Sequence, residues 1–73
     1  MQTEECKGYT LFAVRTAGCR LDVLEVVERI KKLVGYDYGL HEVKVALTYW
    51  VGKGVIAEVG DSIYVWVAAA AER

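Results

Sequence analysis

Apolar residues repeat at intervals of three and four along residues 22–34, which is the spacing of one face of an α-helix. The apolar face comprises Val23, Val26, Val27, Ile30, Leu33 and Val34. Asp22, with Glu25 three residues later, is typical of a capping box at a helix start. Gly35 suits the left-handed position just after a helix end. The pattern therefore predicts a helix over 22–34 that packs on the core through this face.

A second helical pattern covers residues 40–51, after a short turn at 36–39. Its expected core face is lined by Leu40, Val43, Leu47, Trp50 and Val51. Ala46 is small enough to let a neighbouring element approach. Gly52 and Gly54 are expected to end the helix, because glycine is a poor helix former.

The segments 55–59 and 63–67 are rich in β-branched and aromatic residues, which favour strands. The three residues between them, Gly-Asp-Ser at 60–62, have a length common in hairpin loops. With this loop, Val55, Ala57, Val59, Ile63, Val65 and Val67 share one face, and Ile56, Glu58, Tyr64 and Trp66 share the other. Both faces are largely apolar. One is expected to cover the helices, and the other needs a second cover, either the N-terminal segment or another molecule.

The N-terminal segment has a less decisive pattern. Residues 1–8 are polar and are expected to form a loose start. Residues 9–15, YTLFAVR, slightly favour a strand because of their strand-forming types. A short first helix, with Thr10 as its N-cap and Gly18 just past its end, is the alternative. Residues 68–73 form an alanine-rich tail that is expected to add at most a frayed helical turn.

The composition predicts a single folded domain over residues 1–73. Hydrophobic residues make up 55% of the chain, so a core can form without a metal cluster, although a dimer would add stability. Nine basic and ten acidic residues give a net charge of −1, whereas proteins that depend on phosphate contacts usually carry a basic excess. The absence of asparagine beside abundant Val, Glu and Lys slightly favours a thermophile.

The N-terminus, MQTEECKGY, is acidic and polar, so no signal peptide is expected. No apolar run reaches the ~18 residues of a membrane span, and the expected location is the cytoplasm, without a membrane partner. Cys6 and Cys19 are expected to be free, buried thiols, with a disulfide as the less favoured alternative. Met1 is typical of a complete small open reading frame.

Residues 20–67 resemble the winged helix-turn-helix superfamily. The run LTYWVGKGVI at 47–56 carries the resemblance. In such domains the recognition helix often ends in an apolar triplet, followed by a glycine and an apolar pair that opens the wing. The resemblance implies that 22–34 precedes the turn, that 40–51 is the recognition helix and that Gly60–Ser62 is the wing tip.

The resemblance also implies a fold class: a small α+β winged-helix-like domain with two or three helices packed on a β-hairpin wing. Two features depart from the usual pattern of three helices. The first helix is short or absent, and the helix before the turn is longer than usual. A possible N-terminal strand, giving the order βααββ, would satisfy both departures.

The function that the resemblance implies is DNA binding, as a small transcriptional regulator or a chromatin-associated protein with double-stranded DNA as its partner. Outward side chains of 40–51 would read the major groove, where lysine contacts guanine. The predicted nucleic-acid-binding residues are His41, Lys44, Thr48, Tyr49, Lys53, Lys31 and Lys32. The wing tip is acidic at Asp61, with Glu58 nearby, which argues against wing-mediated DNA contact.

The alternative function is a protein interaction module, including a homodimer, without direct nucleic-acid binding. Its predicted interface residues are Val45, Tyr64 and Trp66, with Tyr49 also facing outward. Tyrosine and tryptophan are favoured interface anchors. A competing interpretation of Tyr64 and Trp66 is that they form the core face of the hairpin while the valines face out.

No pattern favours an enzyme. Ser62 and His41 are the single serine and histidine, and Ser62 lies in a predicted turn. Lys53 stands between two glycines but lacks the upstream glycine of a phosphate-binding loop. Cys6, Cys19 and His41 lack the spacing of a zinc site. No catalytic residue, metal site, cofactor or small-molecule substrate is therefore expected.

Overall fold

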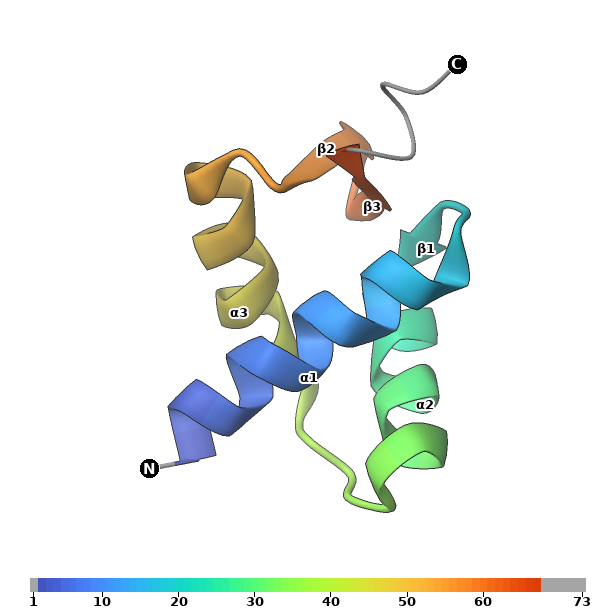
Figure 1. Ribbon diagram of the computed structural model, residues 1–73, viewed down its shortest axis with the longest axis vertical. Coiled ribbons are helices and arrows are strands. Elements are labelled where there is room, and N and C mark those ends of the chain that lie inside the picture. Colours follow the sequence, from blue (N-terminus) through green and yellow to red (C-terminus); the bar gives the residue numbers. More distant parts are fainter. Residues whose placement is uncertain (1, 68–73) are drawn as a thin grey trace.

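The chain forms three helices and a three-stranded antiparallel sheet in a computed structural model that describes residues 2–67. In chain order the elements are α1 (Gln2–Ala17), β1 (Leu21–Asp22), α2 (Val23–Val34), α3 (Leu40–Lys53), β2 (Ile56–Gly60) and β3 (Ile63–Trp66). Helix α1 crosses α2 and α3, and the sheet closes one end of the helical layer (Figure 1). This is the expected α+β winged-helix-like layout. The predicted tail at 68–73 lies outside the described residues.

Helix α1 corrects two expectations about the N-terminus. Residues 2–8 are helical rather than loose, and residues 9–15 continue the same helix rather than forming a strand. The buried face of α1 consists of Cys6, Thr10, Ala13 and Val14, which recur at helical spacing. Thr10 and Cys6 are not strongly apolar, so this stripe is hard to see in the sequence. Packing against α2 and α3 outweighs the strand propensity of the segment.

The short strand β1 follows α1 and replaces the predicted strand at 9–15. Leu21 of β1 pairs with Tyr64 of β3, and Asp22 pairs with Ile63. The sheet order is β1-β3-β2, so the last strand lies between the other two. The order β1-α2-α3-β2-β3 matches the possible order βααββ, but its leading strand lies at Leu21–Asp22 rather than at 9–15, and helix α1 precedes it.

Helix α2 begins and ends at the residues that the sequence indicates. The amide of Glu25 donates to Asp22 Oδ1 at 2.8 Å, and the amide of Asp22 donates to Glu25 Oε1 at 2.9 Å. This reciprocal capping box satisfies two amides that the helix itself leaves free. Gly35 ends the helix with φ +75°, and its amide donates to Lys31 O at 2.8 Å.

The predicted core face of α2 is only half correct. Val26, Val27 and Ile30 are buried, and Val23 is partly buried. Leu33 and Val34, in the last turn, are exposed. Because the helical period continues past the surface that α1 covers, periodicity alone does not show where burial stops.

Helix α3 is two residues longer than expected. Gly52 lies inside the helix, and Gly54, with φ +81°, is the left-handed residue that ends it. Of the predicted core residues, Val43 and Leu47 are buried, as is Ala46, while Trp50 and Val51 are partly buried. Leu40 is exposed, contrary to expectation. The inner side of α3 therefore starts one turn after the helix begins.

The β2–β3 hairpin has the predicted face assignment. Ile56 pairs with Trp66, and Glu58 pairs with Tyr64, so these four residues share one face. Ile56 and Tyr64 are buried in the core, with Trp66 packed against it. The register shifts between Glu58 and Gly60, before the turn at Asp61–Ser62, so Gly60 ends β2 rather than belonging to the predicted three-residue loop. The face with Tyr64 is therefore the one that covers the helices.

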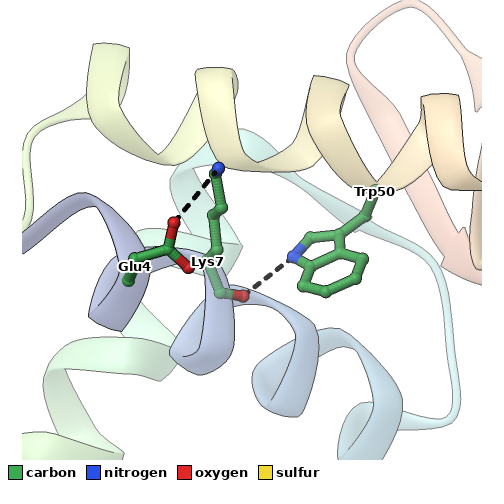
Figure 2. Close-up of polar contacts among 3 residues, drawn as sticks. All are labelled: Glu4, Lys7 and Trp50. Carbon is green, nitrogen blue, oxygen red and sulfur yellow. Dashed lines mark hydrogen bonds and ion pairs between the residues drawn. The ribbon is translucent and has the colours of Figure 1, made fainter.

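Two side chains attach α1 to the other helices through main-chain carbonyls. The indole of Trp50, on α3, donates from Nε1 to Lys7 O at 2.8 Å, and the same Lys7 forms an ion pair with Glu4 at 3.8 Å (Figure 2). Arg29, on α2, donates from Nε to Ala13 O at 2.9 Å. Each such bond contributes about 1 kcal/mol to stability. Within residues 2–67, no helix is long and apolar enough to cross a membrane.

Candidate functional site

A groove opens where the first turns of α2 and α3 meet the tip of the hairpin. Its volume is ≈ 490 Å³. It is lined by Asp22, Val23, Leu24, Leu40, His41, Lys44, Asp61, Ser62 and Ile63. This is the place where the expected recognition helix and wing come together.

The lining of the groove is more apolar than a phosphate-binding surface. Leu24, on α2, is 61% exposed, and Leu40, on α3, is 50% exposed. Contiguous exposed apolar residues with a polar rim are typical of protein interaction sites. The two leucines therefore favour an apolar partner.

The groove carries charges of both signs. Lys44 and His41 line it beside the carboxylates of Asp22 and Asp61. The Asp22 carboxylate also accepts the amide of Glu25, so it serves the start of α2. Within the described residues, neither Lys44 nor Asp61 forms an ion pair. The groove thus offers one cationic and one anionic side chain that have no fixed partner in residues 2–67.

Three of the predicted nucleic-acid-binding residues lie on one exposed side of α3. His41, Lys44 and Thr48 are three and four positions apart, so they follow one another along the helix surface. The hydroxyl of Thr48 donates to Lys44 O at 2.9 Å, which uses its proton within the helix. Lys44 is the one lysine among these three residues, and none of them is an arginine.

Lys53, at the other end of α3, belongs to a different surface. Lys53 is nine positions after Lys44, which turns it to roughly the opposite side of the helix. Its Nζ lies 5.4 Å from the ring centroid of Tyr49, and Nζ of Lys7 lies 3.9 Å from the same centroid. Tyr49 therefore carries two cations, which it holds by cation–π contacts away from Lys44.

Lys31 and Lys32 are exposed in the last turn of α2. They stand roughly 12 Å along the helix axis from Val23, which lines the groove. Arg29 is directed onto α1, where its guanidinium also donates to Thr16 Oγ1 at 3.2 Å. The structure therefore does not gather the predicted lysines into one basic patch.

The predicted interface residues have three different environments. Val45 is exposed on α3. Tyr64 is only 2% exposed, so the expectation that it anchors a partner is wrong, and its alternative role in the core face is correct. Trp66 is partly buried, with the guanidinium carbon of Arg15 at 6.0 Å from its ring centroid. Only Val45 remains freely available to a partner.

A second cavity, of ≈ 200 Å³, lies between α1 and α3 and contains the thiol of Cys6. Lys7, His41, Glu42, Val45 and Ala46 complete its lining. Burial raises the pKa of the Cys6 thiol, an effect that the hydrogen bond to Thr10 partly opposes and the Glu42 carboxylate reinforces. A protonated thiol is a weak nucleophile and a weak metal ligand. The surroundings of this cavity therefore favour the protonated form of the Cys6 thiol.

The two cysteines are both free, as expected, but they differ in burial. Cys6 is buried and Cys19 is exposed, which corrects the expectation of two buried thiols. In the part of the chain that the structure describes, no group of three or more His, Cys, Asp or Glu side chains is arranged to hold a metal ion.

Comparison with known proteins yields no match among protein-family models, curated proteins or solved structures. The assignment of a function therefore depends on the geometry of this chain.

The sequence did not single out Leu24 as a surface residue. Leu24 lies outside the apolar stripe of α2, on the polar face of the helix. Because the polar face of an amphipathic helix is exposed, this position could have indicated that Leu24 is a surface residue. Leu40 was assigned to the core because its spacing fits the α3 stripe. The first turn of α3 extends past the elements that cover the rest of that stripe.

Proposed function

We propose that this protein is a winged-helix-like interaction module that forms a homodimer through the groove between α2, α3 and the hairpin tip. The observation that carries the proposal is the pair of exposed leucines, Leu24 and Leu40, in that groove. A DNA-binding surface at this position would instead present a cluster of lysine and arginine side chains.

The occupant we propose is a second copy of the chain, because the groove is self-complementary in charge. A two-fold interface brings the same patch of two protomers together. A residue on one side of the patch then contacts the residue on the opposite side of the patch in the other protomer. Lys44 of one protomer would then face Asp61 of the other, while the leucines meet near the axis. Such an interface covers apolar surface that a small domain leaves exposed.

Light scattering after size exclusion, over a range of protein concentrations, tests this dimer. We expect the unmodified chain to become dimeric as concentration rises and Leu24→Lys to remain monomeric. Leu33→Lys is the matched control, because Leu33 is an exposed leucine of the same helix that does not line the groove. It should dimerise like the unmodified chain. A monomer at every concentration would overturn the proposal.

The pairing of charges has its own test. Lys44→Asp and Asp61→Lys should each weaken the dimer, because each places like charges opposite one another. The double variant restores opposite charges and should recover much of the affinity. If the double variant is weaker than both single variants, the two-fold arrangement proposed here is wrong.

DNA binding remains a second candidate, and one observation favours it. His41, Lys44 and Thr48 occupy the same exposed side of α3, next to the first turn of α2, in a winged-helix-like layout. A helix of this kind can enter a major groove with its N-terminal residues against the bases.

Titration of a labelled DNA duplex at two salt concentrations tests this second candidate. Binding should weaken steeply between ~50 and ~200 mM salt if lysines contact phosphates. Lys44→Glu should weaken it, whereas Lys32→Glu, at the far end of α2, should have a smaller effect. Absence of binding at ~50 mM salt would exclude this function under those conditions.

A further inference from the structure

Three tyrosines and one glutamate line a recess on a part of the molecule that shares no residue with the groove. Tyr36 and Tyr38 belong to the loop between α2 and α3, and Tyr9 belongs to α1. The recess has a volume of ≈ 190 Å³ and is lined by Glu5, Tyr9, Val34, Tyr36 and Tyr38. We call these residues the tyrosine recess.

The rings of the tyrosine recess meet at steep angles. The centroids of Tyr36 and Tyr38 are 4.6 Å apart with an angle of 66° between the rings. Those of Tyr9 and Tyr38 are 6.2 Å apart at 47°. In the Tyr36–Tyr38 pair the edge of one ring meets the face of the other, and each ring face carries the negative part of its quadrupole. Tyr36 is 48% exposed and Tyr38 is 4% exposed, so a ligand reaches the recess on the side of Tyr36.

The negative charge of the tyrosine recess has no cation opposite it in residues 2–67. Glu5 is exposed, and the one ion pair of the described chain joins Glu4 to Lys7. The cation–π contacts in those residues involve Tyr49 and Trp66 and none of the three recess tyrosines. Burial raises the pKa of Tyr38, and Glu5 adds to the effect, so this phenol stays neutral at physiological pH.

We propose that the tyrosine recess binds a quaternary ammonium group, either as a free choline-like molecule or as the side chain of trimethylated lysine. Aromatic rings that surround such a cation attract it by cation–π interaction, and Glu5 at the rim adds a charge contact. A quaternary ammonium has no N–H group to leave without a hydrogen-bond partner, so its transfer into an aromatic site costs less than that of a primary ammonium. The recess is smaller than the ~300–1,000 Å³ of sites for drug-sized ligands, which suits one small head group.

A pair of isosteric ligands tests the role of charge. Choline and 3,3-dimethylbutanol have the same shape, but only choline carries a positive charge. Titrated into the isotope-labelled protein and followed by NMR, choline should shift the signals of Tyr9, Tyr36 and Tyr38. The neutral isostere should bind roughly ten-fold more weakly or not at all. Equal binding of the two, or no shift by choline at ~10 mM, would overturn the proposal.

Variants at exposed positions test the residues without disturbing the core. Glu5→Gln and Tyr36→Ala should each weaken choline binding several-fold, roughly five- to ten-fold. Tyr36→Phe retains the ring and should bind nearly as the unmodified chain does. Tyr49→Ala is the matched control, since Tyr49 is an exposed tyrosine outside the recess. If Glu5→Gln and Tyr36→Ala bind choline unchanged while their circular dichroism also stays unchanged, the recess is not the site.

Two peptides of one sequence distinguish the sources of the ligand. If a trimethyl-lysine peptide binds more tightly than choline and its unmethylated form does not, methylated protein is the source. If choline binds and the trimethylated peptide does not reach the site, the ligand is a free small cation. Failure of both ligands to bind refutes the site and leaves the proposed dimer unaffected, because the groove has none of these residues.

Discussion

The two sides of α3 differ in nearly every physical respect. The inner side, with Val43, Ala46 and Leu47, is buried against α1 and the sheet. The outer side begins with the exposed Leu40 and continues through Lys44 toward the hairpin tip. The inner side is buried beside the cavity between α1 and α3, whereas the outer side combines apolar surface with charges that have no partner in the described residues.

This difference separates the residues that maintain the fold from those that are available to a partner. Apolar surface that is already buried contributes to folding and has nothing left to contribute to binding. Exposed leucines contribute little to folding and can contribute to binding, because they are buried only when a partner covers them. The comparison can be tested by changing matched residues on the two sides.

The largest expected effect comes from truncating a leucine on each side. Leu47→Ala should lower the free energy of unfolding by about 2–5 kcal/mol, because it leaves a cavity in a packed core. Leu40→Ala should change it by less than about 1 kcal/mol, because that side chain is half exposed. Urea denaturation of both variants, at a concentration where the chain is monomeric, measures the difference.

Equal losses for the two leucines would break the distinction between the sides of α3. Such a result would mean that the side chain of Leu40 is buried in solution. A repeat of the measurement on the Leu24→Lys background, which should not dimerise, shows whether a second protomer provides that cover.

A smaller effect is expected from the indole of Trp50 at the contact with α1. Trp50→Phe removes the hydrogen bond from Nε1 to Lys7 O and should lower the free energy of unfolding by about 1–2 kcal/mol. Tyr49→Phe, at the next position, is the control. The Tyr49 hydroxyl makes no hydrogen bond to the described residues, so its loss should have almost no effect. If Trp50→Phe is as stable as Tyr49→Phe, the hydrogen bond from Trp50 to Lys7 O does not stabilise the fold.

The smallest effect at neutral pH, and the most specific one, concerns Tyr64. Burial raises the pKa of its phenol above the usual 10.0, and the carboxylates of Glu58 and Asp61 add to the shift. In the unfolded chain the phenol ionises near its ordinary pKa, while the folded chain holds the proton to higher pH. The contribution of Tyr64 to the free energy of unfolding is therefore complete below the pKa that its phenol has in the unfolded chain. It is lost as pH rises through the higher pKa of the folded chain.

Denaturation curves at several pH values check this expectation. The free energy of unfolding should be unaffected by this group below about pH 9 and should fall above about pH 10. Tyr64→Phe should reduce the fall, leaving the part that comes from Tyr38, whose pKa is also raised by burial. An unchanged pH profile in Tyr64→Phe would show that Tyr64 does not hold its proton more tightly in the folded chain.

Local signals account for the parts of the fold that were predicted correctly. The Asp22–Glu25 capping box and the C-terminal Gly35 act within a few residues of the helix ends, so their effect can be read from neighbouring positions. The hairpin faces follow from the loop length and the alternation of side chains. The helix at 2–17 was predicted only as a short alternative to a strand at 9–15, because its buried face depends on Thr10 and Cys6, whose burial is a result of packing.

The candidate sites divide in the same way. Spacing along one helix correctly placed His41, Lys44 and Thr48 on one exposed side of α3. It could not show that Lys31, Lys32 and Lys53 lie elsewhere, since they depend on how two helices are arranged in space. Nor could it bring Tyr9 to Tyr38, which are 29 positions apart in the sequence and meet only because α1 packs against the loop before α3.

The sequence by itself determined the two central helices, the hairpin and which residues share each hairpin face, because caps, helical period and strand alternation are properties of neighbouring residues. The tertiary structure decided between strand and helix at 9–15 and between the two hairpin faces as the buried one, and it alone showed that Leu40 is exposed. It also decided that the lysines are dispersed and that three tyrosines share one recess. Burial and proximity between distant segments depend on which elements cover one another, and that arrangement is a property of the packed chain as a whole.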